Sequence, residues 1–196
     1  MSRTTILILV ALGAALAGFA FSTAARQLQD ESSAAEASVA AGPQAAKLGW
    51  RETHGSPGQQ LVFSVESLRV VPGGWRVRLS LENRSSVAFA LGDPRATLNR
   101  SFGLMLFPTG KIEELTDQNA NGTLPAVRPA VAYEPELPAI LEPGASWKGT
   151  MSAPGALAAG SWVRVVFGTL VSVGNPPEEL GESIVWITDR AYRLRA

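Results

Sequence analysis

The residues best suited to bind an ion lie in the run 117–122. This run, Asp-Gln-Asn-Ala-Asn-Gly, places oxygen-bearing side chains at alternate positions and ends in glycine. A calcium-binding loop opens in the same way, because alternate side chains face one ion and the glycine permits a sharp turn. The second half departs from that pattern, with Pro125 at the ninth position and Arg128 at the twelfth, where such loops carry a bidentate glutamate. A calcium- or small-ligand-dependent adhesion domain that uses the loop around Asp117 is therefore the alternative hypothesis, and we assign no metal ligands.

Groups that perform catalysis are sparse in the chain. His54 is the single histidine, and no cysteine is present, which excludes disulfides, thiolate nucleophiles and cysteine-ligated metals. No nucleophile elbow, phosphate-binding glycine loop or dinucleotide fingerprint occurs. Three pairs of acidic residues lie in polar segments, which offer no cleft for acid–base catalysis. They are Glu113 with Glu114, Glu134 with Glu136, and Glu178 with Glu179. We expect no enzyme, no catalytic residues and no cofactor.

The charged residues balance, with 17 Lys and Arg against 17 Asp and Glu. A protein that binds nucleic acid uses an excess of basic side chains to displace counterions from phosphates. The balance therefore favours a partner other than nucleic acid.

Residues 1–25 are typical of a targeting segment, because an uncharged run at 4–25 follows Arg3. Cleavage after Ala24, where small residues suit processing, would make this segment a signal peptide. Retention would make it a transmembrane anchor, since about 20 apolar residues span a hydrocarbon core of roughly 30 Å. Both alternatives remain open. Both predict that the rest of the chain lies outside the cytoplasm, either secreted or as part of a single-pass membrane protein.

Residues 26–47 are rich in Ala, Ser, Gln and Glu. Such a stretch buries little apolar surface and is typical of a flexible linker. Residues 48–196 then remain, and their length of about 150 residues suits one domain.

Beyond Gln59, apolar residues recur at every second position, as expected for strands with one buried face. The clearest run is 75–83, where Trp, Val and Leu alternate with Arg, Ser and Glu. In the run before it, the apolar positions shift near Glu66 and Ser67, which indicates a β-bulge. The sequence Pro-Gly-Gly at 72–74 predicts a turn between the two runs.

Further apolar runs are separated by turns that contain Pro or Gly. They are 87–91, 102–107, 111–115, 139–141, 147–152, 161–173 and 182–188. No segment after Lys47 shows sustained helical periodicity, so we expect the stretch 116–138 to be a long loop. About seven to nine such strands predict an all-β, antiparallel β-sandwich.

The five tryptophans differ in their expected positions. Trp75 and Trp147 occupy the apolar positions of their runs and are expected in the core. Trp162 and Trp186 lie in runs in which the residues expected on both faces of the strand are apolar. One of these two side chains could therefore face outward. Trp50 precedes the predicted strands.

Three stretches support a resemblance to a known group. They are 75–83, the hairpin at 102–110, and Leu-Glu-Pro-Gly at 141–144 leading to Trp-Lys-Gly at 147–149. These stretches resemble the immunoglobulin-like domains of bacterial exported and cell-surface proteins of unknown function. The Cys–Trp–Cys core of antibody domains is absent, and no functional residue carries over. The resemblance implies an immunoglobulin-like β-sandwich outside the cytoplasm, while fold alone leaves function open.

The leading hypothesis is thus a non-enzymatic, extracytoplasmic protein-interaction module. Its expected partner is another envelope or extracellular protein, contacted through strand edges or through the stretch 116–138. The membrane becomes a second partner if residues 1–25 are retained.

Overall fold

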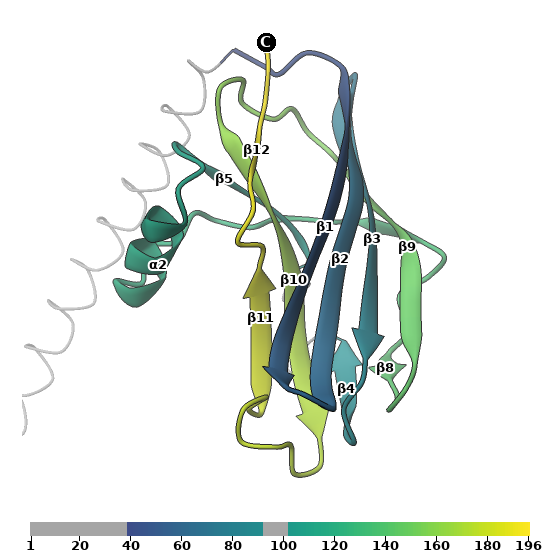
Figure 1. Cartoon of the computed structure of the whole chain (residues 1–196). Coiled ribbons are helices and arrows are strands. Elements are labelled where there is room, and N and C mark those ends of the chain that lie inside the picture. Colours follow the sequence, from purple (N-terminus) through teal and green to yellow (C-terminus); the bar gives the residue numbers. More distant parts are fainter. Residues whose placement is uncertain (1–38, 92–101) are drawn as a thin grey trace, which may run out of the picture. The chain divides into compact units, whose positions relative to one another are not determined.

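The computed structural model describes residues 39–91 and 102–196 (Figure 1). The targeting segment predicted for 1–25, and most of the linker predicted for 26–47, lie outside the described residues. Within the described ranges, no helix has the length and apolar character needed to cross a membrane.

Two antiparallel sheets account for most of the described chain (Figure 1). The first sheet contains, in spatial order, β1 (Gln44–Ser56), β2 (Gln59–Val71), β3 (Gly74–Asn83), β9 (Ser146–Pro154) and β7 (Ala132–Glu134). The second sheet contains β6 (Arg128–Pro129), β5 (Gly103–Phe107), β10 (Trp162–Val173), β4 (Ala88–Leu91) and β8 (Ile140–Leu141). Two further strands, β11 (Ser183–Ile187) and β12 (Tyr192–Arg193), pair with β10.

A single large core contains side chains from both sheets. Trp75 and Leu79 of β3 are buried there, and the exposed positions of β3 alternate with them, because successive side chains of a strand face opposite sides. Phe63 of β2 meets Phe167 of β10 edge to face, with ring centroids 5.0 Å apart. The prediction of an all-β, antiparallel, sandwich-like fold is confirmed at this level.

Local predictions for β2 and β3 are also confirmed. The register between these strands shifts between Val65 and Ser67, as the slipped apolar pattern predicts. β2 ends at Val71 and β3 begins at Gly74, and Gly73 has a positive φ of 77°, which glycine adopts without strain.

The prediction of a strand at 111–115 is wrong, because helix α2 (Ile112–Ala120) occupies these residues. The same helix continues into the start of the stretch 116–138, for which the sequence predicts a loop. Leu115 is the buried residue of α2, and it packs with Met105 and Phe107 of β5 in a second, smaller core. A helix of nine residues that buries one side chain shows no helical period, and tertiary contacts stabilise it. Glu113 and Glu114 in its first turn suit the positive end of the helix dipole.

The first strand begins earlier than the sequence pattern indicates. β1 starts at Gln44, within the range assigned to the linker, and pairs with β2 along most of its length. The prediction that Trp50 precedes the strands is wrong, because Trp50 is buried on β1. The burial of side chains alternates along β1, but its inward positions include Gln44, Glu52 and His54, so its sequence lacks the apolar alternation of β3.

Candidate functional site

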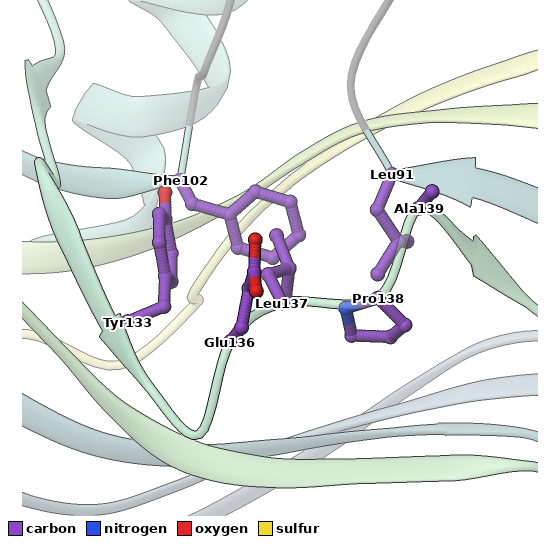
Figure 2. Close-up of a pocket in the computed structure, with 7 residues that line it drawn as sticks. All are labelled: Leu91, Phe102, Tyr133, Glu136, Leu137, Pro138 and Ala139. Atoms are coloured by element: carbon purple, nitrogen blue, oxygen red, sulfur yellow. The ribbon is translucent and has the colours of Figure 1, made fainter.

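A cavity of about 590 Å³ opens between two segments that are distant in the sequence (Figure 2). It is lined by Leu91, Phe102, Tyr133, Glu136, Leu137, Pro138 and Ala139. One wall consists of the end of β4 and the residue that precedes β5. The other wall is formed by Tyr133 of β7 and by the chain that links β7 to β8.

The first wall is placed by β10, with which β4 and β5 both pair. Leu91 at the end of β4 is opposite Leu170, and Gly103 at the start of β5 is opposite Val166. Both partners lie on β10, so β10 sets the positions of Leu91 and Phe102 along this side of the pocket. Phe102 is almost fully buried and forms the apolar floor with Leu91.

The second wall is held by Trp147 of β9. Its indole Nε1 donates a hydrogen bond of 3.1 Å to the backbone oxygen of Glu136. The ring of Tyr133 packs edge to face against both Trp147 and Phe102, with centroid distances of 6.4 Å in each pair. Leu137 packs against the main core. These contacts fix the backbone from which Tyr133 and Glu136 project (Figure 2).

Gly149 explains why Trp147 can lie so close to its own strand. A Cβ atom at residue 149 would lie 2.5 Å from the Trp147 ring and 2.8 Å from the backbone oxygen of Glu134. Atoms of real side chains do not approach so closely, so only glycine fits beneath this indole. The Trp-Lys-Gly sequence at 147–149 therefore serves to position the second wall.

The chemistry of the cavity combines apolar walls with one negative charge. Leu91, Phe102 and Pro138 offer apolar surface, while the exposed Glu136 places a carboxylate at the rim. Within the described ranges, Glu136 forms no salt bridge. This combination suits an apolar group that carries, or lies beside, a cation.

The structure separates the residues of the calcium hypothesis. Asp117 and Asn119 lie on α2, and Asn121 caps its C-terminus. Residues two apart on a helix point to different sides, so they do not converge on one ion as they do in a calcium loop. Among the described residues, no group of three or more His, Asp or Glu side chains is placed to hold a metal.

The remaining catalytic candidates also lie apart. His54 is on β1, where its ring contacts that of Trp186 at a centroid distance of 5.4 Å. Glu134 ends β7 and lines a separate recess with Arg76, whereas Glu136 lines the cavity described above. Glu114 accepts a hydrogen bond of 3.2 Å from the backbone of Thr109, which anchors the start of α2.

A buried arginine that the sequence does not reveal lies beneath the segment before α2. Arg164 of β10 is fully buried and donates hydrogen bonds to four backbone oxygens. These belong to Gly110, Lys111, Thr188 and Asp189. Burial lowers the pKa of Arg164, although the nearby charges of Asp189, Glu52 and Glu114 oppose this effect. Both terminal nitrogens of Arg164 donate to backbone oxygens, so this side chain joins separate segments of the chain, while its Nε has no hydrogen-bond partner among the described residues.

The wall residues Phe102 and Tyr133 are the functional candidates that sequence reasoning missed. Their contact depends on the pairing of β5 with β10 and of β7 with β9, and no local motif encodes such long-range pairing. The fold and the cavity define a sandwich-like β protein with a mixed apolar and acidic surface pocket. Comparisons with protein-family models, with curated proteins and with solved structures found no match to this chain.

Proposed function

We propose that this chain is a non-enzymatic, extracytoplasmic interaction module with an immunoglobulin-like β-sandwich. Its partner is an envelope or extracellular protein that inserts one apolar side chain into the pocket lined by Tyr133 and Leu137. The observation that carries this proposal is the pocket itself, which has apolar walls, a fixed backbone and a charged rim.

The surroundings of the pocket favour a protein partner over a small molecule. Ile140 adjoins the pocket residue Ala139 and has 45% of its surface exposed. It belongs to β8, a two-residue strand at the end of the second sheet, where backbone groups are open to pairing. Protein interfaces commonly combine one deeply inserted side chain with shallower contacts around it. Glu136 at the rim then favours a basic residue next to the inserted side chain.

Site-specific cross-linking in the host cell tests this function. We would place a photoreactive residue at Ala139 in the full-length chain, and at the exposed Thr53 of β1 as a control position. The expected result is one cross-linked partner at position 139 that is absent at position 53. Glu136→Lys should abolish this product, whereas Glu142→Lys, which changes an exposed carboxylate outside the pocket, should preserve it. Equal products at both positions, or a product insensitive to Glu136→Lys, would contradict the proposal.

The proposed location has its own test, which uses the absence of cysteine from the chain. Thr53→Cys introduces a single thiol at an exposed position. A membrane-impermeant maleimide should label this thiol without lysis, on intact spheroplasts if the anchor is retained, or in the fraction released from the cells if the leader is cleaved. Labelling only after lysis would place the domain inside the cytoplasm. N-terminal sequencing of the isolated protein then distinguishes a cleaved leader from a retained anchor.

A further inference from the structure

A second recess lies on the outer face of the first sheet, on strands that contribute no lining residue to the pocket described above. Its volume is about 300 Å³, and it is lined by Ser67, Arg69, Arg76, Arg78 and Thr150. We call this feature the arginine recess. It combines three guanidinium groups with two hydroxyl groups on β2, β3 and β9.

The strand register forces the positive charges together. Arg69 of β2 is directly opposite Arg76 of β3, so two like charges share one cross-strand pair. Arg78 lies two residues further along β3, and residues two apart on a strand share a face. Like charges directly opposite each other destabilise a sheet. The recess thus has an arrangement that folding alone does not favour.

Only part of this charge is neutralised by neighbouring carboxylates. Glu66 forms a salt bridge of 2.9 Å with Arg78 and another with Lys148. Arg69 and Arg76 are exposed, and neither side chain forms a salt bridge or hydrogen bond with the described residues. Glu134 lines the adjoining recess with Arg76 but does not pair with it. Two guanidinium groups therefore remain available to a ligand.

We propose that the arginine recess binds a phosphoryl group, in the form of a phosphate monoester. Such a group concentrates a charge of about −1.5 to −2 and three acceptor oxygens at one point. A planar guanidinium donates two parallel hydrogen bonds to an oxyanion of this kind. The hydroxyls of Ser67 and Thr150 line the same space and add donors. An acidic peptide spreads single charges along its length and matches this compact recess less well.

Titration of the full-length chain with glycerol phosphate tests the proposal. Heat is measured at constant ionic strength, with chloride as the reference anion. We expect saturable binding by the unmodified chain, and binding at least tenfold weaker by the double variant Arg69→Ala/Arg76→Ala. The control Arg193→Ala removes an exposed arginine on β12 of the second sheet and should bind as the unmodified chain does. Circular dichroism should be unchanged in both variants, because the replaced side chains are exposed.

Vesicle flotation distinguishes the possible sources of the phosphoryl group. Vesicles containing phosphatidic acid expose a monoester, whereas vesicles of phosphatidylcholine alone do not. Loss of binding to phosphatidic acid in the double variant, with Arg193→Ala unaffected, would assign the site to a lipid headgroup. Binding of glycerol phosphate without this lipid effect would assign it to a soluble phosphate monoester. The proposal is overturned if neither probe binds, if the double variant binds both probes normally, or if polyglutamate binds where glycerol phosphate does not.

Discussion

The indole Nε1 of Trp186 on β11 donates a hydrogen bond of 2.8 Å to the carboxylate of Glu52 on β1. The same carboxylate accepts the backbone N–H groups of Asp189, at 3.1 Å, and Arg190, at 3.4 Å. β1 belongs to the first sheet and β11 pairs with the second, so one side chain links the two sheets along this side of the sandwich (Figure 1).

Replacing Glu52 with Ala should lower the free energy of unfolding by about 1–3 kcal/mol, because the indole and backbone donors lose their acceptor. Glu52→Gln keeps one acceptor oxygen and should cost less. Urea unfolding measures both changes. Glu142→Ala removes an exposed carboxylate from a turn and serves as the control. Equal losses in Glu52→Ala and Glu142→Ala would show that the link between the sheets contributes nothing.

Arg164→Met should destabilise the protein by about 2–4 kcal/mol, because several buried carbonyl oxygens then lack a donor. The guanidinium also lies over the ring of Phe107, 5.3 Å from its centroid, so the near-ultraviolet circular dichroism should change. Arg164→Lys should not restore full stability, since an ammonium group lacks the planar fork. Arg193→Met, at an exposed position, should be close to neutral. Unfolding curves of Arg164→Met that match those of Arg193→Met would refute this role.

Gly149→Ala should destabilise the domain by about 1–3 kcal/mol, because the added methyl group forces Trp147 away from β9. The same movement should weaken the hydrogen bond between Trp147 and Glu136 and reduce cross-linking at Ala139. Thermal unfolding and tryptophan fluorescence measure the first effect. Ser146→Ala, at an exposed position of the same strand, is the control and should leave thermal unfolding, tryptophan fluorescence and cross-linking at Ala139 unchanged.

The pH dependence of stability should include a contribution from Glu66. The hydrogen bond from Lys148 lowers the pKa of Glu66 below its ordinary value of 4.5, and the charges of Lys148 and Arg78 act in the same direction. A carboxyl group whose pKa falls on folding stabilises the protein above its unfolded pKa, and this stabilisation is lost as the pH falls through the folded pKa.

Glu66→Gln should therefore lower stability at pH 7, by less than about 1 kcal/mol because the pair is solvent-screened. The difference from the unmodified chain should shrink as the pH falls below 4.5. Urea unfolding from pH 7 to pH 3 follows this change, and added salt should reduce the difference at pH 7. A difference in stability between Glu66→Gln and the unmodified chain that grows toward acid pH would contradict the predicted direction of this effect.

The strands that face the core on one side could be predicted from the sequence, because burial imposes a period of two. β3 shows this most clearly, since Trp75, Val77 and Leu79 alternate with exposed arginines. The bulge near Ser67 was predictable for the same reason, because a slip in pairing shifts the apolar positions by one residue.

Other elements could not be predicted, since their sequences carry too little of this signal. β1 is an edge strand with few buried side chains, and α2 depends on the single buried residue Leu115. The strands β6, β7 and β12 have two or three residues each, too few to show a period. The pocket depends on the register of β5 and β7 with their neighbours, which no local pattern specifies.

Gln44 at the start of β1 holds the last strand of the described chain. Its amide accepts a hydrogen bond of 3.1 Å from the backbone N–H of Arg195 and donates one of 3.0 Å to the backbone oxygen of the same residue. The start of β1 and the end of the described chain thus lie beside each other. Joining them through a short glycine linker, and opening the chain at the turn after Pro72, should give a circular permutant that retains every strand pairing. Fusion proteins attached at either end would emerge side by side.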